Sequence, residues 1–184
     1  MPIRVPDNLP ALTELFAEQV DVMAQQQAVS QDIRPLRLLL LNLMPKKRDT
    51  EIQFARLFGN TPLQVEMILM TTASYTPRNT EPGYLRRFYR QLDDVRDQFF
   101  DALIVTGAPI ETLPFEDVSY WPELIEIMEW SRTHCFRRLG ICWGAQALRS
   151  HFFAVPKFEM PEKMFGVYQH RLQNVSGRLM HGFT

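Results

Sequence analysis

The stretch from Arg137 to Ala147 limits most strongly what this chain can fold into. A short apolar run ends at Cys142, and from Ala145 onward the residues favour a helix. This pattern predicts a strand, a sharp turn and a helix, with the thiol of Cys142 at the turn. Gly140 and Gly144 flank the thiol, and such small residues let the backbone bend and the helix pack close to the sheet. The sequence therefore predicts a nucleophile elbow.

Three effects would activate a thiol at this turn. A helix N-terminus stabilises a thiolate, and the backbone N–H of Trp143 would point to the place where an oxyanion develops during acyl transfer. Sulfur is also a good nucleophile and a good leaving group, which suits a covalent acyl intermediate. The alternative is a cysteine that merely fills the core at the end of a strand. The flanking glycines and the change from strand to helix favour the nucleophile.

Composition narrows the class of protein. With 184 residues, 46% of them hydrophobic and 22% charged, the chain can form one medium-sized globular domain or one lobe of a larger protein. Its net charge of -1 gives no electrostatic case for nucleic acid or an anionic membrane. No apolar run is long enough to span a bilayer, and residues 1–7 lack the apolar stretch of a signal peptide. Cys135 and Cys142 fit neither a disulfide framework nor a common zinc pattern, so we expect reduced thiols in a cytoplasmic protein without a metal.

Hydrophobic periodicity predicts an alternation of strands and helices. Residues 1–35 are expected to form an N-terminal helical extension, with an amphipathic helix after Pro10, and residues 36–184 an α/β domain. Strands are expected at 36–43, 63–70 and 100–106, before Cys142, and as a short segment within 161–168. Helices are expected at 50–58, 84–95 and 123–133, and from the elbow to about residue 153. Strand-plus-helix units in this order predict a doubly wound, mostly parallel sheet.

Two strand ends carry further candidate residues. Lys46 and Lys47 follow the first predicted strand of the domain at its carboxyl end, where open α/β sheets bind ligands, so they are either anion contacts or a solvated turn. Gly107 and Ala108 end another strand, either as a tight turn or as a place where the backbone approaches a ligand. Glu111 follows. If its side chain points inward, its volume and charge would disfavour a carboxylated acyl group; otherwise it is a surface carboxylate.

Several short strings occur in order along the chain: MPIRVP at 1–6, LNLMPKK at 41–47, TGAP at 106–109, YWP at 120–122, CW at 142–143, and EK and GVY within 162–168. Jointly, they resemble the homoserine O-acyltransferases of bacterial methionine biosynthesis. That family has a class I glutamine-amidotransferase-like (flavodoxin-like) fold and is distinct from the α/β-hydrolase homoserine acetyltransferases. The resemblance runs from the first residue to the last.

The resemblance implies that Cys142 takes an acyl group from acyl-CoA as a thioester and passes it to the γ-hydroxyl of L-homoserine. Lys163 matches a substrate-contacting lysine of the family, and the Trp143 N–H, with Lys47, would stabilise the oxyanion. Glu111 matches the position associated with acyl preference, where glycine accompanies succinyl-CoA and glutamate acetyl-CoA. Acetyl-CoA is therefore the expected co-substrate, with succinyl-CoA as the alternative donor and serine as the alternative acceptor. We also expect no bound cofactor, and a homodimer.

In one respect the sequence departs from the family. Family members continue past residue 184, and their catalytic His and Glu and a substrate-binding Arg lie in that further part. None of the histidines in this chain matches the family's base: His134, His151, His170 and His181. We therefore expect the N-terminal part of an acyltransferase, which turns over poorly alone, since a general base typically contributes about two to four powers of ten in rate.

Two other classes of protein share parts of this pattern. A glutamine amidotransferase has the same elbow and would release ammonia from glutamine for a partner enzyme. A redox-sensing protein would use Cys142 as a peroxide-reactive thiol. The lysine pair at 46–47 and the region of Lys163 favour the acyltransferase over the amidotransferase. The redox sensor differs in predicting selective oxidation of Cys142 and no acyl adduct.

Overall fold

The computed structural model describes residues 3–6, 8–20, 22–24, 34–61, 63–77, 79–162, 164–171 and 173. Within this part of the chain, seven strands form one parallel sheet. They are β1 (Ile3–Val5), β2 (Val22–Ala24), β3 (Leu36–Leu41), β4 (Val65–Met70), β5 (Tyr89–Arg90), β6 (Phe100–Val105) and β7 (Cys135–Gly140). The predicted α/β class with a parallel sheet is confirmed.

The sheet has the order β2-β1-β4-β3-β6-β7, with β5 also paired to β4. Both β1 and β5 lie on the edge of β4 that faces away from β3: β1 pairs with its first residues and β5 with its last. The order β4-β3-β6-β7 means that the winding reverses direction between β3 and β6. Open α/β sheets bind ligands at the carboxyl ends of the strands that flank such a reversal. The fold therefore directs attention to the residues after Leu41 and Val105.

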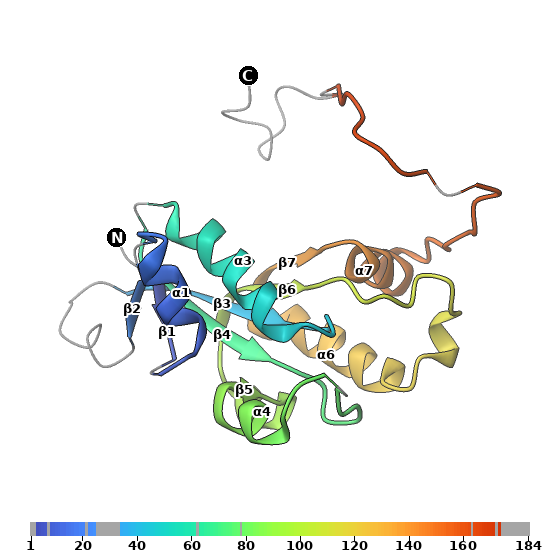
Figure 1. Cartoon of the computed structure of the whole chain (residues 1–184). Coiled ribbons are helices and arrows are strands. Elements are labelled where there is room, and N and C mark those ends of the chain that lie inside the picture. The colour runs from blue at the N-terminus through green and yellow to red at the C-terminus, as the bar shows by residue number, and fades with distance from the viewer. Residues whose placement is uncertain are drawn as a thin grey trace.

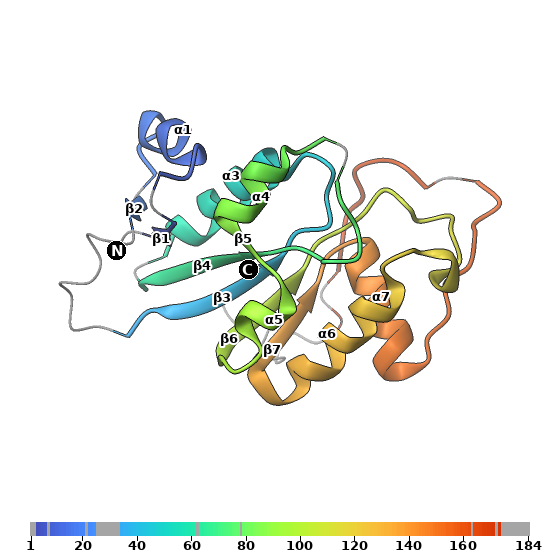
Figure 2. The same ribbon diagram turned by 90° about the horizontal axis from the view of Figure 1, so that it is seen from below.

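Helices cover both faces of the sheet (Figures 1 and 2). The α-helices are α1 (Ala11–Ala17), α3 (Lys47–Gly59), α4 (Pro82–Phe88), α5 (Leu92–Val95), α6 (Trp121–His134) and α7 (Trp143–Phe153), and a 3-10 helix spans Phe115–Asp117. Helices α1, α3 and α4 lie on one face, whereas α5, α6 and α7 lie on the other.

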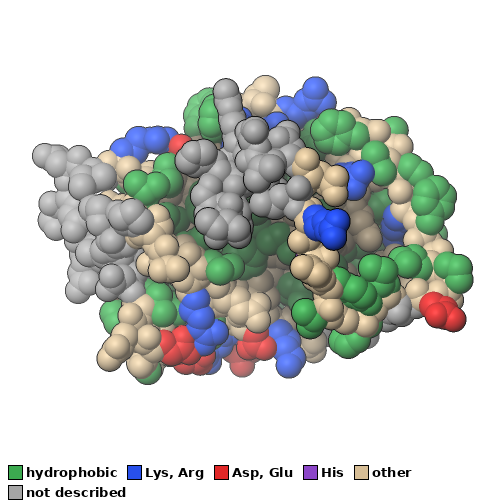
Figure 3. All heavy atoms as spheres, turned by 90° about the horizontal axis from the view of Figure 1, so that it is seen from above, with side chains coloured by type: hydrophobic (Ala, Val, Ile, Leu, Met, Phe, Trp, Pro, Cys, Tyr) green, Lys and Arg blue, Asp and Glu red, His purple; other side chains and the backbone are tan. Residues whose placement is uncertain are grey.

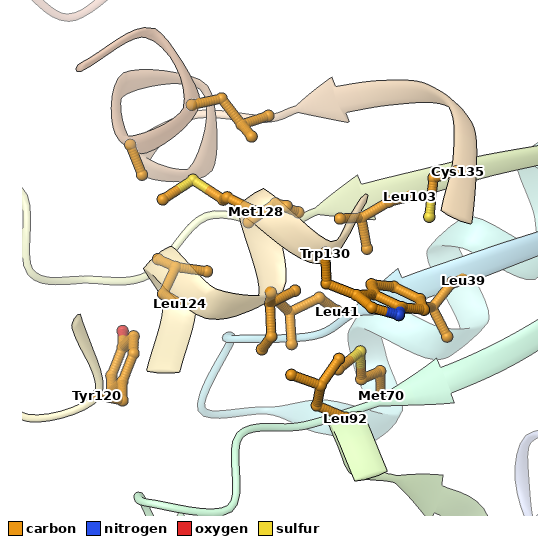
Figure 4. Close-up of a cluster of buried hydrophobic side chains, with 14 of the residues drawn as sticks. Leu39, Leu41, Met70, Leu92, Leu103, Tyr120, Leu124, Met128, Trp130 and Cys135 are labelled. Atoms are coloured by element: carbon orange, nitrogen blue, oxygen red, sulfur yellow. The ribbon is translucent and has the colours of Figure 1, made fainter. Parts of the chain in front are cut away.

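Side chains alternate between the two faces of the sheet along each strand, and the hydrophobic core is therefore divided into two clusters. Leu40 and Ile104 belong to the cluster that includes Ile52 and Ala55 of α3. Leu39, Leu41 and Leu103 belong instead to the cluster with Leu124 and Met128 of α6, which Figure 4 shows together with Trp130 and Cys135. Because neighbouring residues of a strand point to opposite faces, the near-continuous leucines of β3 serve both halves of the core.

The predicted strands beginning at 36, 63 and 100 are confirmed, as are the strand before Cys142 and the helix after it, with small shifts at their ends. The predicted helix over 84–95 is wrong. It is divided into α4 and α5 because Tyr89 pairs with Leu69 in the sheet and Gln91 begins a new helix with a capping box to Asp94. The N-terminal residues supply not only the expected helix, α1, but also β1 and β2, which are too short for periodicity to show.

After α7 the described residues form no helix or strand up to 171, so the short strand expected within 161–168 is absent from the described part of that segment. The segment runs away from the sheet in Figure 1 and exposes several large hydrophobic side chains: Phe158, Met160, Met164, Phe165 and Val167. In the space-filling view of Figure 3, hydrophobic side chains are likewise prominent on the surface.

Two glycines provide a test of how tightly α7 packs on the sheet. A Cβ added at Gly144 would lie 2.4 Å from the backbone oxygen of Val105 and 2.5 Å from that of Thr106, whereas a Cβ at Gly83 meets nothing within 4 Å. We expect Gly144→Ala to lower the free energy of unfolding by about 1–3 kcal/mol, as overpacking does. Gly83→Ala is the matched control, and we expect it to leave that free energy unchanged or to raise it by up to about 1 kcal/mol through helix propensity. Chemical denaturation of both variants measures the difference; equal effects would contradict the packing argument.

Candidate functional site

Cys142 lies at the turn between β7 and α7, and its side chain is exposed. Its backbone has φ 53° and ψ -121°, a positive φ that residues other than glycine seldom adopt. The carbonyl oxygen of Cys142 accepts hydrogen bonds from the N–H groups of Ala145 and Gln146, at 3.0 and 3.2 Å, which fixes the turn. A strained residue at the turn from strand to helix is the backbone geometry that presents a nucleophile at the edge of a sheet.

The end of β6 meets this turn. A Cβ added at Gly107 would lie 3.1 Å from Cβ of Cys142 and 3.5 Å from its Sγ. Gly107 thus leaves room beside the thiol that a larger residue would take up. Thr106 fixes this segment, because its hydroxyl accepts a hydrogen bond from the N–H of Leu43 at 2.8 Å and donates one to the carbonyl oxygen of Gly107 at 3.1 Å.

Trp143, the first residue of α7, offers a hydrogen-bond donor beside the thiol. Within the described residues, no group accepts a hydrogen bond from its backbone N–H, as expected for the first turn of a helix. Its indole is fully buried and packs against three rings, those of Phe115, Tyr120 and Trp121, with ring centroids 5.8 to 6.4 Å apart. The indole therefore anchors the start of α7, while the N–H stays available.

A cavity of about 400 Å³ lies at the carboxyl ends of β3 and β4, next to the loop that follows β6. Its wall includes Leu43, Lys47, Ala108, Ile110 and Tyr120. Since Ala108 follows Gly107 directly, the cavity begins one residue from the backbone that contacts Cys142. Cys142 itself is not part of the wall. The thiol and the cavity therefore both adjoin the short segment after β6.

Of the two adjacent lysines, one lines this cavity and the other is exposed to solvent. Lys47 begins α3, is buried, and lines the cavity. Its Nζ donates to the carbonyl oxygen of Asn42 and lies 5.6 Å from the centroid of the Tyr89 ring. Burial lowers the pKa of Lys47 to about 8, against the opposing attraction of Glu51. Lys46 is exposed and lies 4.0 Å from Asp49. Of the pair, Lys47 is the one placed to meet a ligand in the cavity.

The remaining candidates lie elsewhere or outside the described residues. The side chain of Glu111 is exposed, and its backbone oxygen accepts a hydrogen bond from Lys157 at 2.9 Å. Glu111 is not among the residues that line the cavity. Lys163 lies outside the described residues, so its predicted substrate contact stays a prediction.

Two histidines on helices are engaged away from the thiol. The ring of His134 stacks on Trp130 with centroids 5.0 Å apart, and Nε2 of His151 lies 2.6 Å from the carboxylate of Glu129. His170 is exposed in the segment after α7, and His181 is outside the described residues. Neither helical histidine is therefore placed as a base for Cys142.

Sequence reasoning missed a buried polar cluster beside Lys47, which includes Asn42, Glu51 and Tyr89. Asn42 directly after a run of leucines was the one signal for it. Among the described residues, no group of three or more His, Cys, Asp or Glu side chains could hold a metal ion. No helix in that part of the chain is long and apolar enough to cross a membrane.

Comparison with known proteins gives a consistent result. A family model for homoserine O-succinyltransferase matches residues 2–184. A homoserine O-acetyltransferase of Desulfitobacterium hafniense (strain DSM 10664 / DCB-2) is 51% identical over 183 residues, which are 100% of this chain and 60% of that protein. A homoserine O-acetyltransferase of Thermotoga neapolitana is 54% identical over 172 residues, which cover 94% of this chain and 57% of that protein. A homoserine O-acetyltransferase of Brevibacillus brevis is 50% identical over 183 residues, which cover 100% of this chain and 60% of that protein.

The chain thus spans about 60% of the length of these curated relatives. The match nevertheless extends over almost every residue of the chain, including the thiol turn, the lysine pair and the end of β6. The chain belongs to the homoserine O-succinyltransferase family.

Proposed function

We propose that this chain carries the acyl-accepting thiol of a homoserine O-acyltransferase. Cys142 would take an acetyl group from acetyl-CoA and pass it to the γ-hydroxyl of L-homoserine, in methionine biosynthesis in the cytoplasm. The observation that carries the proposal is the exposed thiol at a positive-φ turn, against Gly107 and beside the free N–H of Trp143. Family membership and relatives named homoserine O-acetyltransferase support the reaction class.

The reaction divides into two balanced steps. In the first, the Cys142 thiolate attacks the acetyl carbonyl carbon, and the oxyanion receives a hydrogen bond from the N–H of Trp143. The bond from carbon to the sulfur of CoA then breaks, CoA leaves as a thiol after taking up a proton, and a thioester remains on Cys142. In the second, the homoserine hydroxyl attacks this thioester, loses its proton to a base, and releases the thiol.

The second step needs a base that the helical histidines do not supply, because His134 and His151 are engaged elsewhere. The resemblance places that base in the part of family members beyond residue 184. We therefore propose that this length of chain forms the thioester more readily than it transfers it to an acceptor. In this proposal acyl-CoA is a substrate and not a resident cofactor. We also propose that the protein assembles as a homodimer.

The two cysteines allow a direct test of which thiol is reactive. Cys135 is buried, and burial raises its pKa to about 12, so at pH 8 only about one Cys135 in ten thousand is a thiolate. We expect iodoacetamide at pH 8 to alkylate Cys142 and to leave Cys135 unmodified, as measured by peptide mass spectrometry. In Cys142→Ser no alkylation should occur. Equal modification of both thiols would contradict the structural assignment.

Intact mass spectrometry after mixing with acetyl-CoA tests the proposed function itself. We expect one acetyl increment that disappears in Cys142→Ser and persists in Cys135→Ser, because the acyl group is bound as a thioester to the exposed thiol. Release of ammonia from glutamine without consumption of acetyl-CoA would instead identify a glutamine amidotransferase. Selective peroxide oxidation of Cys142 without any acyl adduct would identify a redox sensor.

The donor preference depends on Glu111 in this proposal. Replacing Glu111 by glycine removes a negative charge that would repel the free carboxylate of a succinyl group. We expect Glu111→Gly to raise the ratio of succinyl to acetyl adduct about fivefold, which corresponds to about 1 kcal/mol for two charges ~4 Å apart in water. Glu116→Gly, which removes an exposed carboxylate from the 3-10 helix that follows Glu111, is the control. An unchanged ratio in Glu111→Gly would remove Glu111 from the argument, and a succinyl adduct alone on the unmodified chain would point to succinyl-CoA as the donor.

A further inference from the structure

A buried cluster of polar side chains surrounds Lys47 at the cavity wall. It joins three elements: Asn42 follows β3, Lys47 and Glu51 belong to α3, and Tyr89 belongs to β5. All four side chains are buried, and Glu51 is fully so. Burying a carboxylate without partners costs much free energy, so the groups that bind Glu51 determine whether it can be charged.

The hydrogen bonds of this cluster have a fixed direction. The backbone N–H of Met44 can only donate, and it donates to Oδ1 of Asn42 at 3.1 Å. The amide nitrogen of Asn42 therefore points the other way, to the backbone oxygen of Lys47 at 3.2 Å and the hydroxyl of Tyr89 at 2.9 Å. Since the Tyr89 oxygen accepts this bond, its proton is donated to Oε1 of Glu51. The chain of donors thus runs from Met44 to Glu51.

Both oxygens of Glu51 accept hydrogen bonds, because the hydroxyl of Tyr84 donates to Oε2. This pattern is that of an ionised carboxylate. Burial raises the pKa of Glu51, whereas the two tyrosine hydroxyls and the charge of Lys47 oppose that rise. Burial and the neighbouring carboxylate also raise the pKa of Tyr84 and of Tyr89, so both remain donors.

Lys47 is the second charge of the cluster. Among the described residues, the carbonyl oxygen of Asn42 is the one acceptor of its ammonium, which leaves two N–H groups for a ligand. Glu51, one helical turn further along α3, stabilises the charged form of Lys47 without a direct ion pair. The other charges nearby are Arg48, which pairs with Glu14, and Asp117 on the cavity wall.

We propose that Glu51, held by Tyr84 and Tyr89, is a positioning residue that keeps the Lys47 ammonium charged at the cavity wall, where it binds an oxyanion of the substrate. The assignment of that oxyanion to the acyl-transfer reaction rests on the proposed function. The cluster itself predicts a property of Lys47 that can be measured without any turnover.

The test is the titration of Lys47 by NMR in the chain labelled with ¹³C- and ¹⁵N-lysine, its signal identified by its loss in Lys47→Met. In the unmodified chain we expect a midpoint near pH 8, with the charged form below it. In Glu51→Gln we expect the midpoint to fall by about one pH unit or more, because an attractive charge is lost while the burial remains. Asp49→Asn removes an exposed carboxylate of the same helix and should leave the midpoint unchanged.

An unchanged Lys47 midpoint in a folded Glu51→Gln chain would overturn the proposal and leave the cluster a purely structural connection. If circular dichroism shows that Glu51→Gln does not fold, Glu51→Met combined with Tyr84→Phe decides instead. This double variant removes the charge and one of its donors together, so the Lys47 midpoint should again fall, because an attractive charge is lost while the burial remains. No fall in the double variant would likewise overturn the proposal.

The rate of Cys142 acetylation as a function of pH then connects the cluster to the chemistry. We expect the rate to decline above the Lys47 midpoint, and this decline to move to lower pH in Glu51→Gln together with the NMR midpoint. A decline that stays in place while the NMR midpoint moves would show that Lys47 does not act in acylation. If the unmodified chain forms no acetyl adduct, the proposed function fails, yet the NMR titration still decides the role of Glu51.

Discussion

The close approach of α7 to the end of β6 is the constraint on which the candidate site depends. The backbone of Gly144 lies so near the carbonyl oxygens of Val105 and Thr106 that no side chain fits between them. Gly140 is equally restricted, since a Cβ there would lie 2.5 Å from Cα of Ala145. Only with both glycines can the helix begin immediately after the strand, and that abrupt start gives Cys142 its positive φ and its exposure.

The reversal of winding between β3 and β6 places two chemical functions next to each other. In the segment after β6, Gly107 lies against the thiol that neighbours the N–H of Trp143, and Ala108 lines the cavity together with Lys47. The hydroxyl of Thr106 ties the end of β3 to this segment. The site is thus assembled from strand ends that are far apart in sequence, as the topology of open α/β sheets requires.

Local sequence was sufficient to predict the turn at Cys142. The cysteine, its flanking glycines and the change from a strand-like to a helix-like hydrophobic pattern all lie within a few residues of one another. It was not sufficient for the lysine pair. Nothing local shows that Lys47 is buried and Lys46 exposed, since that depends on where α3 starts and on Tyr89, which arrives from β5. Glu51 looks like an ordinary helical surface residue for the same reason. The cluster is a product of tertiary contacts, which periodicity does not record.

The separation of the two cysteines has a consequence for oxidative chemistry. Cys135 opens β7 and Cys142 follows its end, so the length of an extended strand, roughly 20 Å, lies between their Cα atoms. A disulfide needs Cα atoms about 4.4–6.8 Å apart. Cys135 therefore cannot resolve a sulfenic acid formed on Cys142 of the same chain. Recovery from peroxide needs a thiol other than Cys135, and further peroxide otherwise oxidises the sulfur to irreversible acids.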